Sequence, residues 1–423
     1  MKLLPLACSL VCAATASSQD PAQVLRGQND WLYIAGNGHS QRCFEGEVHL
    51  DADALERWCA VVASRRVWCE ARDIRYALLV TPDKHQIYPE HVPEDWRAAE
   101  ADTCLDRFFA ALEEAELAAP IDVRATLLAA KEEQQVYFPY GSHWNDRGGF
   151  LAYHALAQRL GLEAWPRTDF EEIPSPVGGD DLGILLGIEH PPQEAPYLSP
   201  LRERRASLDE IWEGAHGLID GRTKHPDSRL PRAILFRDSF ANWLWYYLAE
   251  HFSSLRMESV SFFDPRIVLE HRAAVVIDQF VERQLEFQNP EPLVEGEELE
   301  RLTRWVAAGA ALQSDRRANR GSGSVRLADT NEENYPLEAD LSDLERRQEA
   351  VLRLELHAED AGFVEVGFRS SRRRRDTIRV RFEPGRDWLF VPLEGARRVS
   401  EAEIYVRAEQ GSARLLAWEL RGI

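Results

Sequence analysis

Residues 233–252 decide the fold, and they read AILFRDSFANWLWYYLAEHF. The stretch begins with an apolar run, residues 233–236, which is typical of a buried strand. After three polar residues, apolar side chains recur from Phe240 with the period of a helix. Ser239 therefore lies at a predicted strand-to-helix turn, where the free N–H groups of the helix N-terminus suit a developing oxyanion. Ser239 either caps this helix or acts as a nucleophile, and the stretch alone leaves both interpretations open.

Apolar runs that predict buried strands alternate with segments of helical period along the rest of this region. The strand-like runs lie at residues 76–80, 121–123, 259–263 and 274–278, and the helical segments at residues 55–72, 102–118 and 150–160. This alternation predicts an α/β domain over residues 25–285, with a parallel sheet flanked by helices. Residues 163–230 are rich in Pro, Gly and charge, and they predict an insertion with helical pieces at residues 181–187 and 208–218.

The hydrophobic period changes from that of a helix to two near residue 351. Leu352, Leu354 and Leu356 alternate with charged residues, and later segments repeat this pattern. Several short strands at this spacing predict a C-terminal β-sandwich over residues 346–423, a candidate for carbohydrate binding. The acidic and polar residues 286–345 between the two regions predict a linker.

The overall composition and the N-terminus indicate an exported protein. The 423-residue chain carries a formal net charge of -21, which makes nucleic acid an unsuitable partner. Residues 1–16 combine one Lys, an apolar stretch and small residues, as a secretory signal peptide does. We therefore expect a periplasmic or secreted protein.

Four cysteines remain after the predicted signal peptide. An even number in an exported chain suits one or two disulfides, although the sequence does not give the pairing. Two of them lie ten residues apart on one predicted helix and should not pair with each other. No close CxxC pair is present, which argues against a Cys-rich zinc site. We expect no metal and no cofactor. The four are Cys43, Cys59, Cys69 and Cys104.

Ser239 and His143 are the candidates for acyl-transfer chemistry. His143 precedes the predicted helix at residues 150–160, just as Ser239 precedes its own helix. Both side chains can then face the same edge of a parallel sheet, where a serine nucleophile and a histidine base would meet.

Five sequence blocks in one order resemble the SGNH-hydrolase-like domain of the alginate O-acetyltransferase family. The blocks are GQNDWLYIAGN (27–37), VTPDKHQIYPEHVP (80–93), YGSHWNDRGGFLAYHAL (140–156), GGDDLGILLG (178–187) and LPRAILFRDSFANWLWYYLAEHF (230–252). The resemblance implies that Ser239 forms an acetyl-enzyme and that His143 activates it. It also implies a polysaccharide substrate and an acetyl donor delivered by a membrane partner.

The chain departs from the family pattern at Gly141. The family carries an Asp two residues before the His, and such an Asp orients the imidazole and stabilises the imidazolium. Asp83, at the end of a predicted strand, or Asp146 could replace it. The alternatives are a Ser–His dyad with a backbone carbonyl behind the ring, and a site that binds without turnover.

Further residues are candidates for oxyanion and substrate contacts. The backbone N–H of Ser239 is the natural oxyanion donor, and the second is either Asn145, which could equally cap the following helix, or the turn at Gly36-Asn37. Positively charged side chains could contact an anionic glycan. They are Arg237, Lys84, and the loop arginines Arg372, Arg373 and Arg374.

These observations together predict an exported serine-dependent O-acetyltransferase that acts on an alginate-like exopolysaccharide. Two alternatives remain at this stage. An acetylesterase would use the same Ser239 and His143 with water as the acceptor. A catalytically silent polysaccharide-binding or export protein would explain why the position of Gly141 lacks its Asp.

Overall fold

A computed structural model of the chain describes most of its residues. They are residues 24–35, 39–47, 50–98, 102–117, 120–174, 181–188, 196–215, 218–259, 263–312, 319–328, 335–337, 350–369, 375–393, 404–410 and 412–423. The chain forms two compact units. The first comprises Met1–Arg65, Ile74–Asp264 and Ala273–Pro292, and the second comprises Arg66–Asp73, Pro265–Arg272 and Leu293–Ile423. The predicted signal peptide lies outside the described residues.

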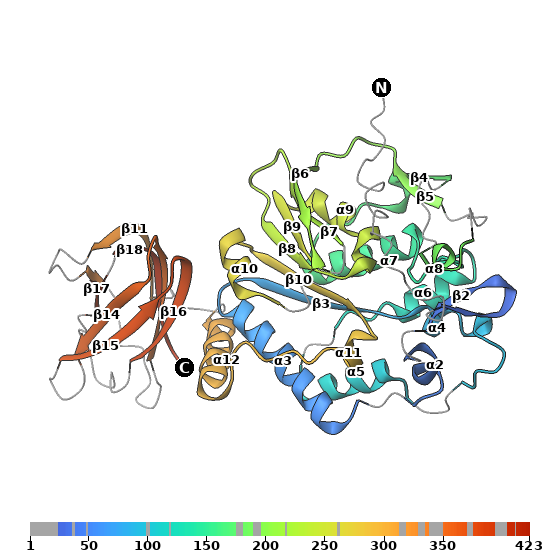
Figure 1. The fold of residues 1–423 in the computed structure, drawn as a ribbon. Helices are drawn as coiled ribbons and strands as arrows, with labels where there is room; N and C mark the ends of the chain where they lie inside the picture. Colours follow the sequence, from blue (N-terminus) through green and yellow to red (C-terminus); the bar gives the residue numbers. More distant parts are fainter. Residues whose placement is uncertain are drawn as a thin grey trace. The chain divides into compact units, whose positions relative to one another are not determined.

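A six-stranded sheet forms the centre of the first unit (Figure 1). Its strands, in spatial order, are β3 (Arg75–Thr81), β10 (Val275–Val281), β8 (Arg232–Phe236), β9 (Ser254–Glu258), β7 (Ile219–Lys224) and β6 (Ser207–Glu213). The pairs from β3 to β9 are parallel, whereas β7 pairs antiparallel with β9 and with β6. The α/β class is confirmed, but the sheet is mixed rather than parallel.

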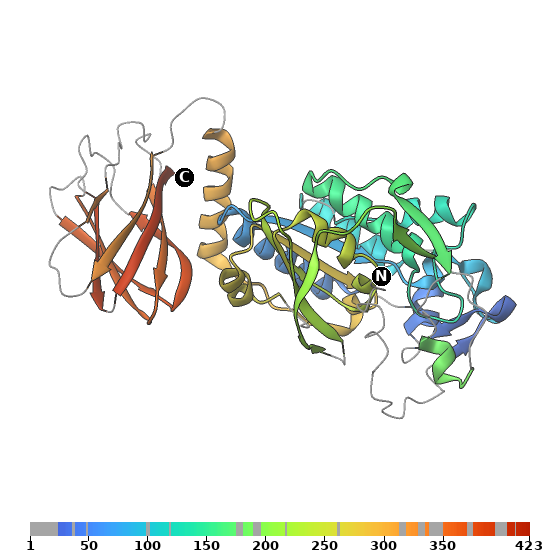
Figure 2. The same cartoon turned by 90° about the horizontal axis from the view of Figure 1, so that it is seen from above.

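Helices cover both faces of this sheet (Figure 2). Alternate residues of β3 enter different cores: Ala77 and Leu79 pack with helix α7 (Asp146–Leu160), and Leu78 and Val80 pack with helices α3 (Ala52–Glu70) and α5 (Cys104–Glu114). This is the period of two expected of a strand that is buried on both faces.

Shorter elements complete the first unit. They are β1 (Val24–Arg26), η2 (Gln28–Asp30), β2 (Leu32–Ile34), α2 (His39–Phe44), α4 (Lys84–Ile87), η4 (Pro89–His91), α6 (Arg124–Lys131), η5 (Arg167–Asp169), β4 (Phe170–Pro174), α8 (Asp181–Leu185), β5 (Pro196–Pro200), η7 (Ser239–Trp243), α9 (Trp245–Leu248), η8 (Ala249–His251) and α11 (Gln284–Phe287). The hairpins β1–β2 and β4–β5 are antiparallel.

Two predictions for this unit need correction, and a third falls largely outside the described residues. Residues 208–213 belong to strand β6, which pairs with β7, and do not form a helix. The strand expected at residues 259–263 falls mostly on residues 260–262, which are outside the described part; the strand before it is β9. The helix expected from Phe240 is broken into η7, α9 and η8. This last stretch is rich in aromatic residues, whose low helix propensity favours such short turns.

The second unit contains the predicted β-sandwich. One sheet has the order β11 (Asn319–Ala328), β18 (Ser412–Gly422), β13 (Ala350–Ala358), β16 (Gly385–Leu393), and the other has the order β12 (Tyr335–Leu337), β17 (Ile404–Gln410), β14 (Gly362–Arg369), β15 (Arg375–Phe382). All pairs are antiparallel, and one apolar core includes side chains from both sheets. The inward residues Leu352, Leu354 and Leu356 are fully buried, which confirms the alternation seen in the sequence.

The region expected to be a linker is partly folded. It contains helix α12 (Gly296–Leu312) and strands β11 and β12, while α10 (Pro265–His271) belongs to the same second unit. The buried Leu302 and Trp305 explain why α12 is ordered, since a helix of this composition has an apolar stripe to cover.

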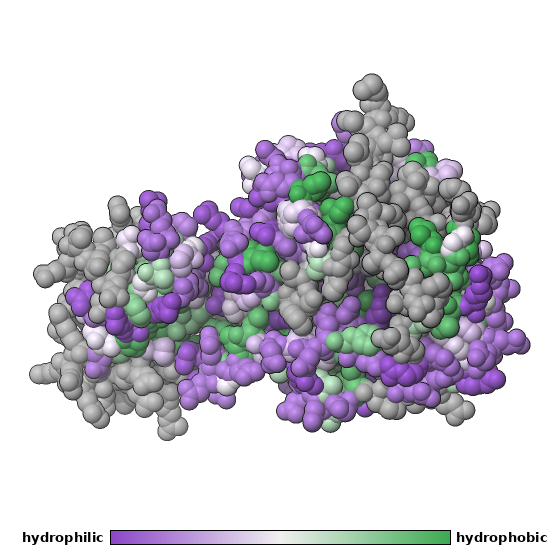
Figure 3. All heavy atoms as spheres, in the orientation of Figure 1, coloured by the Kyte–Doolittle hydropathy of each residue, from purple (hydrophilic) through white to green (hydrophobic). Residues whose placement is uncertain are grey.

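The next features are the surface of the described residues and the state of the four cysteines. On the face drawn in Figure 3, hydrophilic side chains cover much of the described surface, with smaller hydrophobic areas between them. None of the helices in the described residues has the length and apolar composition to cross a membrane. The four cysteines are free thiols, which differs from the expected disulfides. Cys59 and Cys69 do share helix α3, roughly 15 Å apart along its axis, too far to bond.

Candidate active site

Ser239 lies at the carboxyl end of strand β8, as the first residue of helix η7. The preceding Asp238 fixes this turn, because its carboxylate accepts hydrogen bonds from the Phe240 amide (2.9 Å) and the Val281 amide (2.7 Å). Asp238 thus caps the helix, and the Ser239 side chain, half-buried, is left for another partner.

His143 is that partner. The distance between His143 Nε2 and Ser239 Oγ is 2.6 Å. The histidine ring packs between the rings of Phe240 and Trp243, with centroid distances of 4.8 Å and 4.9 Å. Its side chain is 11% exposed, so these rings cover most of it.

Lys84 holds the loop that carries His143 through three hydrogen bonds to its backbone. The Lys84 ammonium donates hydrogen bonds to the carbonyls of Phe138 (3.0 Å), Pro139 (3.1 Å) and Gly141 (2.6 Å). Burial lowers the pKa of Lys84 to about 7. The loop is further held by the bond from the Trp144 indole to the Phe240 carbonyl, 2.9 Å. The two halves of the site are therefore joined directly to each other.

Close approach of helix α7 to η7 also sets the distance between the two side chains. A Cβ added to Gly149 would lie 2.1 Å from the Trp243 carbonyl oxygen, a contact that no side chain can make. Glycine at this position lets the backbone that follows His143 pack against the backbone that follows Ser239.

Asp181 stands behind the histidine, on the side opposite Ser239. Its Oδ1 lies 3.6 Å from His143 Nδ1. Ser142 connects the two: its Oγ lies 3.1 Å from Nδ1 and donates to Asp181 Oδ2 at 2.6 Å, and its amide donates to Oδ1 at 2.9 Å. With the Nδ1 proton directed to Ser142 or Asp181, Nε2 is left free to accept a proton from Ser239.

The charge of Asp181 is maintained by these neighbours. Burial acts to raise its pKa, but His143 and the two hydrogen bonds from Ser142 outweigh this and lower the pKa to about 2. The side chain is 41% exposed, so water screens part of its charge. A second bond docks the helix that carries it, because the Gly183 amide donates to the Tyr140 carbonyl at 2.9 Å.

The two carboxylates proposed from the sequence have other partners. Asp83 pairs with Arg283. Asp146 accepts a hydrogen bond from the Leu198 amide (2.7 Å), and burial raises its pKa to about 7. Neither is brought to His143; Asp181 takes the position for which both were considered.

Three other candidates also have structural roles. Asn145 caps α7 through bonds from the amides of Arg147 and Gly148, and its own amide donates to Gln135 O, so it is not directed at an oxyanion. Arg237 is buried and bonded to Asp220, Ile219 O and Asn242. Lys84 is likewise buried beneath the loop. Both were predicted to contact an anionic glycan through their positive charge, but each is enclosed by acceptors within the protein. Gly36, Asn37 and the loop arginines 372–374 lie outside the described residues.

The sequence contained one signal for Asp181. It belongs to the block GGDDLGILLG, and helix α8 begins with it, as predicted. Nothing in the pattern indicated its contact with a loop 39 residues earlier, because that contact depends on how the insertion folds back.

Comparison with known proteins now adds a family. Residues 24–221 match the family model described as the SGNH hydrolase-like domain of the acetyltransferase AlgX. The resemblance inferred from the five sequence blocks is thereby confirmed.

Individual relatives have a narrower overlap. The chain is 30% identical over 246 residues to the probable alginate O-acetylase AlgJ of Pseudomonas syringae pv. tomato, covering 56% of this chain and 59% of that protein. It is 31% identical over 236 residues to the probable alginate O-acetylase AlgJ of Pseudomonas aeruginosa, covering 53% and 57%. The chain thus spans less than two thirds of the relatives it matches.

The likeness to solved structures is weaker. The O-acetyltransferase domain of Pseudomonas putida AlgJ is 19% identical, with a TM-score of 0.41, covering 66% of this chain and 98% of that chain.

Proposed function

We propose that the protein is a serine-dependent O-acetyltransferase that transfers acetyl groups to hydroxyls of an exopolysaccharide, alginate-like in its chemistry. The 2.6 Å contact between Ser239 Oγ and His143 Nε2, with Asp181 behind the ring, is the observation that carries this proposal. The match to an acetyltransferase domain family supports it.

The first half-reaction acetylates Ser239. His143 Nε2 takes the hydroxyl proton while Oγ attacks the acetyl carbonyl of the donor. The tetrahedral intermediate collapses, the donor leaves with the proton from His143, and the acetyl group remains on Ser239. Asp181 stabilises the transient imidazolium, both directly and through Ser142.

The second half-reaction reverses these roles with a different partner. A sugar hydroxyl gives its proton to His143 Nε2 and attacks the acetyl-serine carbonyl. Ser239 then leaves and regains the proton, and the acetyl ester of the sugar is released. The Ser239 backbone N–H lies at the first turn of η7, where amides have no acceptor within the helix, and it serves as the oxyanion donor.

Asp181 supports a working site over a silent one. The argument for a silent protein was that Gly141 leaves the imidazole without a carboxylate, whereas the helix α8 supplies one from another segment. We further propose that the protein acts in the periplasm or outside the cell, and that a membrane partner supplies the acetyl donor.

The test compares the purified protein with Ser239→Ala, using release of acetate from a chromogenic acetate ester. Ser207→Ala is the matched control, because Ser207 is exposed on strand β6 of the same sheet. We expect loss of activity only in Ser239→Ala, and acetylated Ser239 in the wild-type protein by mass spectrometry. Equal rates of acetate release from all three proteins would refute the proposal that Ser239 is a catalytic nucleophile.

Adding an oligosaccharide acceptor separates the transferase from an esterase. A transferase should form acetylated sugar at the expense of free acetate, and Ser239→Ala should form none. Release of acetate that no acceptor reduces would identify an esterase with the same acyl-enzyme.

A further inference from the structure

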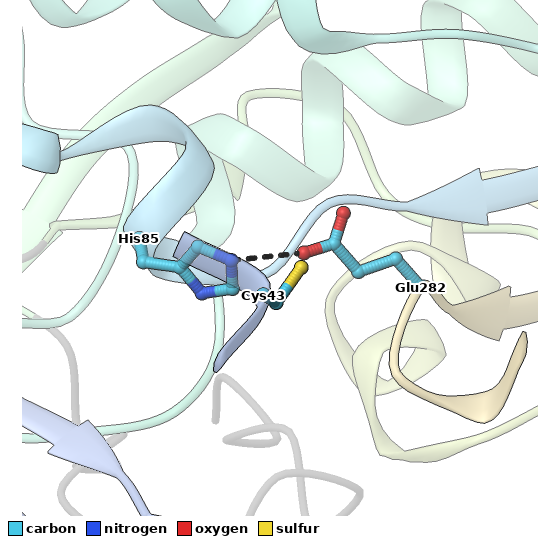
Figure 4. Close-up of side chains that lie close together, drawn as sticks. All are labelled: Cys43, His85 and Glu282. Carbon is cyan, nitrogen blue, oxygen red and sulfur yellow. Dashed lines mark ion pairs between the residues drawn. The ribbon is translucent and has the colours of Figure 1, made fainter. Parts of the chain in front are cut away.

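A second histidine cluster lies on the face of the sheet that α3 and α5 cover. Cys43 comes from α2, His85 from α4, and Glu282 from the turn after β10. Their ligand atoms all lie within 4.8 Å of one another, and all three side chains are buried. Figure 4 shows that they point toward one another from three separate elements. The proposed function uses none of them.

The polar atoms of this cluster lack ordinary hydrogen bonds. His85 Nε2 and both carboxylate oxygens of Glu282 are buried without a partner in ordinary hydrogen-bond geometry among the described residues, and the Gln86 side chain and the Asp83 backbone are the polar groups near the carboxylate. His85 Nε2 and Glu282 Oε1 are 3.3 Å apart, but they are not aligned as donor and acceptor. Buried polar groups in native proteins are nearly always paired, so three such atoms in one place call for a missing partner.

One separation within the cluster, that between His85 and Glu282, fits a metal ion as that partner. Zinc binds histidine nitrogen and carboxylate oxygen at about 2.0–2.2 Å in a tetrahedral arrangement, which places these two ligand atoms about 3.3 Å apart. This is the separation observed between His85 and Glu282. A thiolate sulfur as the third ligand favours zinc over magnesium or calcium, which prefer oxygen alone.

We propose that Cys43, His85 and Glu282 bind a divalent ion of the zinc class, with a fourth position filled by water. The set has three protein ligands of the types that zinc accepts, supplied by residues far apart in sequence. No metal was expected from the sequence, which has no close cysteine pair, and only the fold brings these three residues together.

The test is metal titration of the full chain after reduction and removal of metals with a chelator. Cobalt(II) should bind with one equivalent and give a thiolate-to-cobalt charge-transfer absorption, and zinc should displace it. Zinc should also raise the melting temperature of the wild-type protein. Failure of the wild-type protein to take up either ion stoichiometrically overturns the proposal.

Variants assign the ion to these residues. Cys43→Ser should lose the charge-transfer absorption, and Glu282→Gln, which keeps the side-chain shape, should bind at least about 10–100-fold more weakly. Cys59→Ser, a thiol outside the cluster, should bind as the wild type does. Circular dichroism checks that each variant folds. If Cys43→Ser fails to fold, the metal affinity of Glu282→Gln decides whether the ion binds at this cluster.

Two results would contradict the assignment even if metal binds. Unchanged affinity in both Cys43→Ser and Glu282→Gln would place the ion elsewhere. A disulfide on Cys43 in the protein as isolated without reductant would show that the sulfur has another partner. Because neither readout involves acetyl transfer, failure here leaves the proposed function untouched.

Discussion

The two histidine clusters of the first unit contain similar groups in opposite environments. Around His143, the polar atoms form a continuous chain of contacts: Ser239 lies on one side of the ring, and Ser142 and Asp181 lie on the other. Around His85, the ring Nε2 and both Glu282 carboxylate oxygens are buried and unpaired, and the Cys43 sulfur lies near them. Ordered pairing suits the movement of a proton, whereas converging, unpaired ligand atoms suit an ion. The side-chain types alone therefore do not define the chemistry; their connections do.

The largest effect that tests this comparison is the loss of activity in Ser239→Ala. We expect a decrease of at least about 10³-fold in kcat with an activated acetate ester, since the nucleophile itself is removed. Steady-state kinetics measure it, and circular dichroism confirms the fold. If the variant retained more than a small part of the rate, His143 would be serving a different group.

Asp181→Asn should have the second largest effect. We expect a decrease in kcat of about 10²–10³-fold, somewhat below the full effect of losing a buried triad carboxylate, because Asp181 is partly exposed and acts through Ser142 as well. The comparison variant is Asp146→Asn, which alters the carboxylate proposed from the sequence and should leave kcat nearly unchanged. The opposite ranking would return Asp146 to the site.

Moving the carboxylate would refine this result. In the Asp181→Asn background, Gly141→Asp restores the arrangement in which the acid stands two residues before the histidine. We expect partial recovery of kcat. Recovery would show that His143 needs a negative charge and that its source is interchangeable.

Asp146 itself should affect stability rather than catalysis. Its pKa is about 7 in the folded protein and about 4 in an unfolded chain, so only the folded state holds the proton between these values. The free energy of unfolding should therefore fall as pH rises from about 4 to about 7, by up to about 4 kcal/mol from this group.

Asp146→Asn should remove this part of the pH dependence. Denaturant unfolding of both proteins at several pH values measures it, and the variant should be the more stable relative to wild type at the higher pH. Parallel curves for the two proteins would show that Asp146 is ionised in the fold.

The smallest effect is expected from Lys84→Met. Three carbonyls of the His143 loop lose their donor, so we expect a loss of about 1–3 kcal/mol in stability and a decrease in kcat of about 10-fold as the loop loosens. Lys224→Met, at an exposed position, is the control. Equal melting temperatures and rates in the two variants would show that the loop holds its shape without Lys84.

Much of the fold followed from local pattern. The apolar run of β3 predicted a strand buried on both faces, and the alternation of the sandwich strands predicted strands with one buried face. The pattern failed for residues 208–218, where β6 lies at the edge of the sheet and its mostly exposed side chains carry no clear period of two. An edge strand is stabilised by one neighbour's backbone, which side-chain periodicity does not record.

The site was predictable in part for the same reason. Ser239 and His143 lie at the ends of elements that the sequence outlines. Asp181 acts through a contact with a segment 39 residues away, and Lys84 and Arg237 are charged groups enclosed by acceptors that only the fold supplies. Residue type predicts exposure on average. Lys84 and Arg237 are buried exceptions, because backbone carbonyls and a paired carboxylate accept their hydrogen bonds.

Helix α4 has a consequence for how this chain can change. It is four residues long, and its first two residues serve different clusters: Lys84 holds the loop of His143, while His85 faces Cys43 and Glu282. Adjacent helical residues point about 100° apart. A single inserted or deleted residue between β3 and α4 would rotate both side chains away together. The positions of both clusters therefore depend on the number of residues between β3 and α4. We expect insertions and deletions at this junction to be tolerated less well than substitutions.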